Sequence, residues 1–455
     1  MNPEIFREYD IRGIADSDIP SSDAQLIGKA YGTIIHNNGG SRVIVGRDNR
    51  VSGPRILKAL MDGILSTGIN ITFIGEVSTP LLYYAVSKLE CEGGISVTAS
   101  HNPPEFNGFK VLVGKSAIYG EAIQQIRKVA EKGEFAKGKG AMQSKDLEEQ
   151  YLNEIASLVH FTSPQKKLKV VIDAGNAMAS DLAPRLLKKI GLEPICLFCE
   201  KDPSFPNHMP DPVDEKNVKD LQKTVLSEKA DLGVAFDGDS DRVGVVDDKG
   251  RLIYGDRLLA ILAQDALKRN PGGKVIFEVK CSQALPEWVE KHGGKPIMWK
   301  TGHSLIKAKM KEENALIAGE MSGHMFFTEK WYGFDDALLA AAKIIEIAAN
   351  SQKKLSELVD AIPSYHSSPE IRIDCPDNKK AGVVAKISKK YKKLFPNSIT
   401  IDGIRIIFPR QDGWALVRQS NTQPKLILRF EAKNAQGLKK LEEKILPEVR
   451  SLISE

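Results

Sequence analysis

Residues 231–242 read Asp-Leu-Gly-Val-Ala-Phe-Asp-Gly-Asp-Ser-Asp-Arg, an apolar strand that stops at a loop of carboxylates. Residues 94–103 and 315–324 repeat this plan, with strands that end at Thr-Ala-Ser-His-Asn-Pro and at Gly-Glu-Met-Ser-Gly-His. Strands that alternate with helices indicate α/β units around mixed or parallel sheets, which bind ligands at the carboxyl ends of strands. The earlier strands of these units are residues 42–48, 169–175 and 274–280, and helical patterns follow at residues 53–67 and 179–190.

The last part of the chain follows a different pattern. Its apolar and polar residues alternate as in half-buried antiparallel strands, at residues 371–374, 403–408, 414–420 and 425–431. Hydrophobic cores stop growing near roughly 250–300 residues, so a chain of 455 residues requires several domains. We expect three similar α/β domains with mixed sheets plus a C-terminal α+β domain. The predicted boundaries are residues 1–146, 147–250, 251–363 and 364–455.

Charge and hydropathy exclude two classes of partner. The chain has 64 Lys and Arg against 59 Asp and Glu, a net charge of +5, which argues against nucleic-acid binding and suits small anionic substrates. No apolar run approaches the roughly 20 residues of a membrane span. The most apolar stretch, residues 337–349, contains Lys343 and Glu346 and is typical of a core helix.

The cysteines and the N-terminus favour a cytoplasmic protein. Five scattered cysteines do not suggest a disulfide framework, and the polar N-terminus lacks the apolar core of a signal peptide. Cys196 and Cys199 have the spacing of a redox pair. They lie in an apolar strand without a second pair at metal spacing, so we expect two buried structural thiols rather than a redox centre.

Ser100 is a candidate nucleophile, because it follows a buried strand beside His101 and Asn102. A serine hydroxyl is a weak nucleophile unless another group accepts its proton. His101 is too close in sequence to be assumed as that base, and a simple turn with side-chain hydrogen bonds is an equal alternative. Lys110 would enter the same site if the chain doubles back as a strand.

Asp237, Asp239 and Asp241 form a candidate metal loop. Three carboxylates at alternating positions converge when the backbone turns around an ion, and oxygen ligands suit Mg²⁺ or Ca²⁺. The Ca²⁺ loop fails, because Arg242 and Asp248 stand where that loop needs Gly and Glu. We therefore expect Mg²⁺ rather than a solvated acidic turn. Mg²⁺ usually completes its shell with phosphate oxygens, which points back to Ser100.

Two further loops could bind a substrate. Residues 319–324 offer a carboxylate, a hydroxyl and an imidazole to sugar hydroxyls, although a tight turn is an equal alternative. Residues 418–424, Arg-Gln-Ser-Asn-Thr-Gln-Pro, combine a guanidinium with hydroxyls and an amide, the composition of a phosphate cradle. An ordinary hairpin loop would explain the second stretch equally well.

Together, in this order, the four loops resemble those of the α-D-phosphohexomutase superfamily, most closely its phosphomannomutase/phosphoglucomutase branch. Residues 6–13 and 300–307 also look like this branch. The resemblance implies a heart-shaped molecule around a central cleft. It also implies reversible interconversion of hexose 1-phosphate and hexose 6-phosphate, for mannose and glucose, through a phosphoserine and a 1,6-bisphosphate. Glucose 1,6-bisphosphate or mannose 1,6-bisphosphate would act as activator, and the enzyme would be a monomer.

The resemblance assigns roles residue by residue. Ser100 would carry the phosphoryl group, and Mg²⁺ would bind Asp237, Asp239, Asp241 and the phosphate on Ser100. Proton transfer and charge stabilisation would involve His101, Lys110, Arg12 and His324. The substrate-binding residues would be Tyr9, Arg242, Lys280, His303, Glu320, Ser322, Arg418, Ser420, Asn421 and Thr422.

Three alternatives remain on the sequence alone. Phosphoglucosamine mutase shares the chemistry, but its sugar loop usually has Gln where Met321 stands here. A metal-dependent phosphatase that uses Ser100 would release free phosphate. A non-enzymatic sugar-phosphate-binding or metal-binding protein on the same fold would bind its ligand without turnover.

Overall fold

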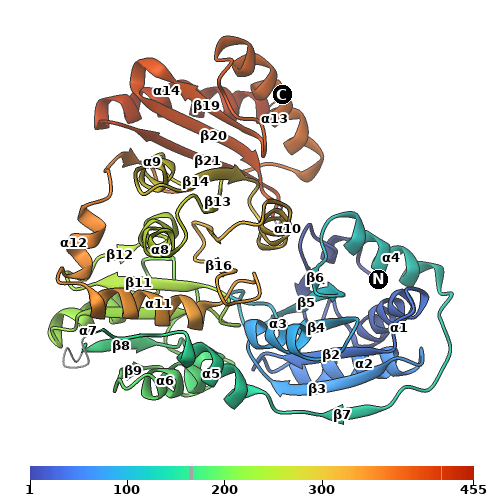
Figure 1. Ribbon diagram of the computed structural model, residues 1–455. Helices are drawn as coiled ribbons and strands as arrows, with labels where there is room; N and C mark the ends of the chain where they lie inside the picture. The colour runs from blue at the N-terminus through green and yellow to red at the C-terminus, as the bar shows by residue number, and fades with distance from the viewer. Residues whose placement is uncertain (163–167, 422, 455) are drawn as a thin grey trace.

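The computed structural model describes residues 1–162, 168–421 and 423–454. Within these residues the strands form four sheets, one after another along the chain. Figure 1 shows the four units around the centre of a heart-shaped molecule, with the first unit on the right and the fourth at the top. The first three sheets are mixed and the fourth is antiparallel, which confirms the predicted fold class.

The first unit places the serine loop at the middle of its sheet. Its elements are β1 (Ile11–Ile14), α1 (Ser21–Asn37), β2 (Arg42–Arg47), α2 (Gly53–Leu65), β3 (Asn70–Glu76), α3 (Thr79–Lys88), β4 (Gly93–Val97), β5 (Phe106–Val113), β6 (Ser116–Ala117), α4 (Glu121–Lys132) and β7 (Met142–Ser144). The strand order is β1-β5-β4-β2-β3-β7, and β4 is buried along its whole length. Helices α1, α2 and α4 cover one face, and α3 covers the other.

The second unit places the carboxylate loop between two antiparallel strands. Its elements are α5 (Glu148–Ser157), β8 (Val170–Asp173), α6 (Ala179–Lys189), β9 (Ile195–Leu197), α7 (Lys219–Ser227), β10 (Leu232–Phe236), β11 (Val243–Asp247) and β12 (Leu252–Ile253). The strand order is β12-β11-β10-β8-β9. Because β10 and β11 pair directly, residues 237–242 must reverse the chain in a tight loop.

The third unit carries the candidate sugar loop between β15 and β16. Its elements are α8 (Gly255–Arg269), β13 (Lys274–Glu278), α9 (Ala284–Lys291), β14 (Lys295–Trp299), α10 (His303–Glu313), β15 (Ile317–Gly319), β16 (Met325–Phe327), α11 (Ala337–Asn350) and α12 (Leu355–Asp360). Helix α11 confirms the predicted core helix. It packs on α8 of its own unit and on α5, α6, β10 and β11 of the second unit.

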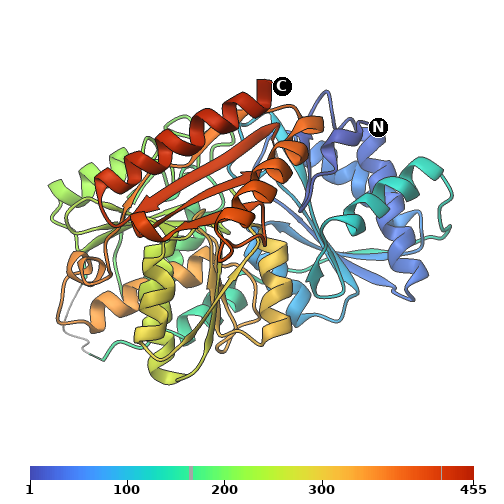
Figure 2. The same cartoon turned by 90° about the horizontal axis from the view of Figure 1, so that it is seen from above.

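The fourth unit rests on the third through the uncovered face of its sheet. Its elements are β17 (His366–Ser367), β18 (Ile371–Asp374), α13 (Asp377–Leu394), β19 (Ile404–Phe408), β20 (Gly413–Gln419), β21 (Lys425–Ala432) and α14 (Ala435–Ser454). Figure 2 shows α13 and α14 on the outer side of this sheet. On the inner side Arg405, which stacks on Trp414, donates hydrogen bonds to the carbonyls of Val279 (2.8 Å) and Cys281 (2.7 Å).

Two other sequence predictions can be compared with the structure. Cys196 is exposed and Cys199 is only partly buried, so the prediction of two buried thiols is wrong, because the strand β9 lies at the edge of its sheet. Burial, reinforced by the adjacent Cys196, raises the pKa of the Cys199 thiol, which disfavours a thiolate redox centre.

Among the described residues, no helix is both long and apolar enough to cross a membrane. The domain boundaries after residues 146, 250 and 363 stay a prediction.

Candidate active site

Ser100 lies in the loop after β4, and its backbone is left-handed, with a φ of 53°. Its amide donates to Thr98 Oγ1 at 2.9 Å, and Thr98 Oγ1 donates to Asp48 Oδ2 at 2.7 Å. A left-handed serine is uncommon and marks a residue that is held by its surroundings. The conformation also keeps Ser100 Oγ near its neighbour His101, whose Nδ1 is 3.3 Å away.

Arg50 holds this loop, and sequence reasoning missed it. Its buried guanidinium donates to the carbonyls of Ser100 (2.7 Å) and Asn102 (2.6 Å) and to two further carbonyls of the same loop. Nε donates to Asp48 Oδ2 at 3.1 Å, so the arginine is itself fixed. Arg50 follows β2, which neighbours β4 in the sheet, and that position was the available signal.

The three carboxylates of the metal loop converge on Ser100. Ser100 Oγ donates to Asp237 Oδ2 at 2.6 Å, and Asp237 Oδ1 accepts from the amides of Asp241 (3.0 Å) and Arg242 (3.1 Å). Asp237, Asp239 and Asp241 are fully buried and can each direct one oxygen to a common ion. The predicted meeting of the serine loop with the carboxylate loop is therefore present in the structure.

The chemistry of this cluster fits a divalent cation. Asp239 Oδ1 and Asp241 Oδ1 are buried and lack a hydrogen-bond partner among the described residues. Burial, together with Asp239 and Asp241, raises the pKa of Asp237 well above its usual range, as crowded carboxylates without a cation require. An all-oxygen donor set suits Mg²⁺. Three buried carboxylates, two of them with an unpartnered oxygen, thus form a candidate metal centre.

Lys110 supplies positive charge to the same cluster from β5. Its Nζ is 2.8 Å from Asp239 Oδ2 and also pairs with Asp241. Burial disfavours the charged ammonium, but the Asp239 and Asp241 carboxylates outweigh burial and raise the pKa of Lys110. Lys110 therefore stays charged beside the carboxylate cluster, and β5 doubles back as its predicted entry into the site required.

Gly238 permits the close approach of the two loops. A Cβ at this position would lie 2.1 Å from the Ser100 carbonyl oxygen, far inside van der Waals contact. Any side chain must therefore push the metal loop away from the serine loop.

Gly238→Ala is expected to lower kcat/KM by about 100-fold, because a displacement near 1 Å is enough to misalign reacting groups. Steady-state assays and thermal unfolding of the purified variant would measure the effect. Gly382→Ala on α13 is the matched control, since nothing lies within 4 Å of its Cβ position, and it should keep full activity. Retention of more than half of the activity by Gly238→Ala would contradict this interpretation of the contact.

Two further cationic or titratable groups border the serine loop. Arg12 Nη1 donates to Asn102 Oδ1 at 3.1 Å, and Arg12 also pairs with Asp10. Burial, reinforced by Arg242 and Arg12, lowers the pKa of His101 well below its usual range. His101 is therefore neutral beside Ser100 Oγ.

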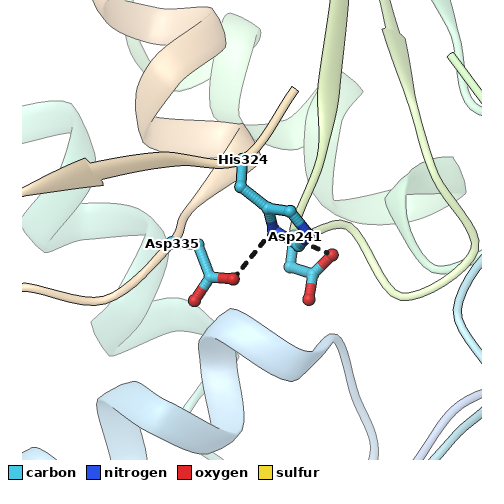
Figure 3. Close-up of side chains that lie close together, drawn as sticks. All are labelled: Asp241, His324 and Asp335. Carbon is cyan, nitrogen blue, oxygen red and sulfur yellow. Dashed lines mark ion pairs between the residues drawn. The ribbon is translucent and has the colours of Figure 1, made fainter. Parts of the chain in front are cut away.

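His324 joins the carboxylate loop to the third unit, as Figure 3 shows with Asp241 and Asp335. Its Nδ1 lies 2.8 Å from Asp335 Oδ2 and 3.6 Å from Asp241 Oδ1. Its Nε2 accepts from Arg242 Nε at 3.0 Å, so the ring proton is on Nδ1 and faces Asp335. These three groups are close enough to hold an ion, but a proton on Nδ1 leaves His324 paired with Asp335 and flanked by Asp241. Sequence reasoning missed Asp335.

Glu320 anchors the candidate sugar loop to the start of α10. Its Oε1 accepts from the Gly302 amide at 2.7 Å, and burial raises its pKa. Ser322 is half-buried in the same loop, and the ring of His303 stacks on that of His324 with centroids 5.5 Å apart. Through His324, which lies 3.6 Å from Asp241, the sugar loop therefore adjoins the carboxylate cluster.

Glu278, which sequence reasoning also missed, contacts the sugar loop by accepting from the Met321 amide at 3.3 Å. It accepts from Thr301 Oγ1 at 2.7 Å and from the Lys280 amide at 3.0 Å. Lys280 Nζ reaches Glu370 Oε2 of the fourth unit at 3.2 Å. Lys280 therefore lies at the junction of the third and fourth units.

The phosphate cradle approaches from the fourth unit. Arg418 is buried, and its Nη2 has no partner among the described residues. Ser420 Oγ accepts from the Gln423 amide at 3.1 Å, and Asn421 Nδ2 contacts the Tyr9 hydroxyl. The predicted Thr422 lies outside the described residues.

Tyr9 completes the ring of contacts around the site. Its hydroxyl donates to the Thr301 carbonyl at 2.8 Å while it meets Asn421. The first, third and fourth units thus touch at one phenol, and the second unit reaches the first through Asp237 and Ser100. The residues predicted from four separate loops converge on one site.

The comparisons with known proteins agree with this architecture. Four domain families described as "Phosphoglucomutase/phosphomannomutase" match in order: alpha/beta/alpha domains I, II and III at residues 3–137, 149–250 and 254–365, and the C-terminal domain at residues 370–448. A "Phosphomannomutase/phosphoglucomutase" of Pseudomonas aeruginosa is 45% identical over 96% of this chain and 93% of its own length. A "Phosphoglucomutase" of Neisseria meningitidis is 43% identical, with coverages of 96% and 95%.

A solved structure leads to the same result. A "Phosphoglucomutase/phosphomannomutase family protein" from Burkholderia thailandensis superposes with a TM-score of 0.93 at 40% identity, over 99% of this chain and 98% of that chain. Similarity of this extent covers every unit and all the loops that meet at Ser100. The chain therefore belongs to the phosphoglucomutase/phosphomannomutase family of the α-D-phosphohexomutase superfamily, and it is a hexose-phosphate mutase.

Proposed function

We propose that this enzyme interconverts the 1-phosphates and 6-phosphates of mannose and glucose, with Ser100 as the phosphoryl carrier. The observation that carries the proposal is the 2.6 Å hydrogen bond from Ser100 Oγ to Asp237, inside a carboxylate cluster that fits Mg²⁺. The names of the similar mutases from Pseudomonas and Neisseria support both sugars. We further propose a cytoplasmic monomer that glucose 1,6-bisphosphate or mannose 1,6-bisphosphate activates.

In each cycle Ser100 gives one phosphoryl group to the sugar and receives a different one from it. Phosphorylated Ser100 gives its phosphoryl group to O6 of a hexose 1-phosphate, as the Oγ–P bond breaks and the O6–P bond forms. The resulting 1,6-bisphosphate turns around, and Ser100 Oγ takes the phosphoryl group from O1 and leaves the 6-phosphate. Mg²⁺, when bound to Asp237, Asp239 and Asp241, offsets charge on the phosphoryl oxygens.

The side chains around Ser100 stabilise charge and transfer protons during the reaction. Lys110 and Arg12 place positive charge beside the transferring group, and His101 lies in contact with Ser100 Oγ. His324 takes the proton of the attacking sugar hydroxyl through Nε2. Arg242 Nε donates to that nitrogen in the structure, so Arg242 must first turn to the substrate phosphate.

The far side of the site holds the end of the substrate that is not reacting. The non-reacting phosphate binds Arg418, Ser420, Asn421 and Thr422, whose composition suits a phosphate. Glu320 and Ser322 bind the O3 and O4 hydroxyls, which keep similar positions in both orientations. Tyr9, Lys280 and His303 line the same space. Because mannose and glucose differ only at C2, a site that recognises the sugar through its O3 and O4 hydroxyls accepts both sugars.

Arg418→Ala should raise KM for glucose 1-phosphate by about 10–100-fold, because one charge-assisted contact to phosphate is worth about 1.5–3 kcal/mol. Initial-rate kinetics with each hexose 1-phosphate would measure this change. Arg410→Ala, an exposed arginine of the same unit, is the matched control and should leave KM unchanged. Equal KM values for the Arg418 variant and the wild type would remove Arg418 from the cradle.

The proposed function is tested directly by phosphorus NMR. The enzyme is incubated with Mg²⁺, a trace of glucose 1,6-bisphosphate and, in separate samples, mannose, glucose or glucosamine 1-phosphate. We expect 6-phosphate signals from the mannose and glucose samples and little from glucosamine. Inorganic phosphate without 6-phosphate would show a phosphatase, and a 6-phosphate signal only from glucosamine would show the aminosugar mutase.

A further inference from the structure

Asp402 lies in the turn before β19, directly beside Arg418 of β20. The next residue, Gly403, has a φ of 69°, and a Cβ there would meet the Val417 carbonyl oxygen at 2.3 Å and Arg418 Cα at 2.8 Å. Only glycine combines this conformation with so close an approach. The backbone therefore holds Asp402 next to the main chain of Arg418, the proposed phosphate-binding arginine.

One oxygen of Asp402 joins two units of the molecule. Asp402 Oδ2 accepts from Arg418 Nε at 3.0 Å and from the Thr301 amide of the third unit at 3.1 Å. The side chains of Asp402 and Arg418 are only 12% and 5% exposed. Asp402 accepts from Nε of Arg418 and so fixes the guanidinium. The buried Nη2 of Arg418 has no partner among the described residues and can bind an anion.

Thr301 and Gly302 link this carboxylate to the sugar loop. The Thr301 amide binds Asp402, and the next amide, of Gly302, donates to Glu320 Oε1 at 2.7 Å. A Cβ on Gly302 would lie 2.4 Å from the ring of Tyr9, so this segment is also held from the first unit. Consecutive amides thus connect the carboxylate beside the phosphate arginine with the carboxylate of the sugar loop.

We propose that Asp402 is a positioning residue that orients Arg418 for the non-reacting phosphate and couples phosphate binding to the contact of the fourth unit with residues 301–302. The inference rests on the proposed function, because it takes a sugar phosphate as the ligand. Phosphate on Arg418 Nη2 stabilises the geometry in which Nε stays on Asp402. The same Asp402 oxygen then keeps the Thr301 amide, and with it the Glu320 contact, in place.

The test uses equilibrium binding of glucose 1-phosphate to the full-length Ser100→Ala protein, in which turnover is absent. Adding Asp402→Ala should raise Kd by about tenfold or more, the loss expected when a charged donor loses its fixed orientation. Adding Asp402→Asn should change Kd by less than about twofold, because a single amide oxygen can accept both hydrogen bonds that Asp402 Oδ2 accepts. Asp374→Ala, which removes an exposed carboxylate of the same unit, is the matched control.

Amide hydrogen exchange at residues 300–303 separates positioning from a merely structural role. Glucose 1-phosphate should slow exchange there in the Ser100→Ala protein and in the Asp402→Asn variant, but not in the Asp402→Ala variant. A Kd for Asp402→Ala within twofold of its background, or equal losses in the Ala and Asn variants, would overturn the inference. Absence of glucose 1-phosphate binding in the Ser100→Ala background would overturn the inference and the proposed sugar-phosphate site together.

Discussion

Ser100→Ala should lower kcat for glucose 1-phosphate by at least about 10⁴-fold, because the variant has no oxygen to carry the phosphoryl group between the two half-reactions. The variant should also lose any mass increase of one phosphate that the purified wild-type enzyme shows. Folding should be preserved, since Arg50 and Asp48 hold the loop through the Ser100 carbonyl and the Ala99 amide, which the substitution leaves in place. Coupled assays, intact-mass spectrometry and thermal unfolding provide the three measurements.

Ser180→Ala on α6 is the matched control, because it removes another buried serine hydroxyl away from the carboxylate cluster. It should retain turnover and the phosphate mass. Survival of the phosphate mass in Ser100→Ala would show that another residue carries the phosphate. Survival of turnover without that mass would instead point to direct transfer between sugars.

Asp237→Asn is expected to lower kcat by about 10³-fold and to raise the Mg²⁺ concentration for half-maximal activity by about 100-fold or more. The amide can replace the acceptor for the Asp241 and Arg242 amides, so the loop keeps its shape. Burial, together with repulsion from Asp239 and Asp241, raises the pKa of Asp237, and the substitution removes one of these three crowded carboxylates. In EDTA the Tm of the variant should therefore equal or exceed that of the wild type.

The control for this experiment is Asp173→Asn on β8, a buried aspartate that pairs with His208 at 3.0 Å. It should change Tm without changing the Mg²⁺ requirement. A Mg²⁺ titration of activity and thermal unfolding with and without EDTA distinguish the two variants. An unchanged Mg²⁺ requirement in Asp237→Asn would remove Asp237 from the metal centre.

The fold could be predicted because its signals are local. Apolar strands such as β2, β8 and β13 end at polar loops, and the alternating pattern of the last unit marks antiparallel pairing. The loop residues of the site could also be predicted from the sequence, because Ser100 and Asp237 stand at the carboxyl ends of buried strands. Edge position is not a local property, which is why the exposure of Cys196 on β9 could not be predicted.

The residues that sequence reasoning missed act through distant partners. Arg50 binds carbonyl groups about 50 residues further along the chain. Asp335 pairs with the His324 ring, and Asp402 accepts a hydrogen bond from an amide of another unit. Single charged residues like these are usually solvated at the surface, so nothing local distinguishes them. Their roles appear only when the packing of the units fixes which backbone groups need a partner.

Helix α11 has a consequence for how the protein is made. It packs on β10 and β11 and on α5 and α6, so the core of the second unit is incomplete until residues 337–350 have been synthesised. The last strand of that unit, β12, ends at Ile253, so the ribosome must add a further hundred residues or so before the core can close. At about 5–20 residues per second this delay lasts about 5–20 seconds, during which apolar surface is exposed and can be bound by chaperones. The nascent second and third units therefore mature together, as one folding event late in translation.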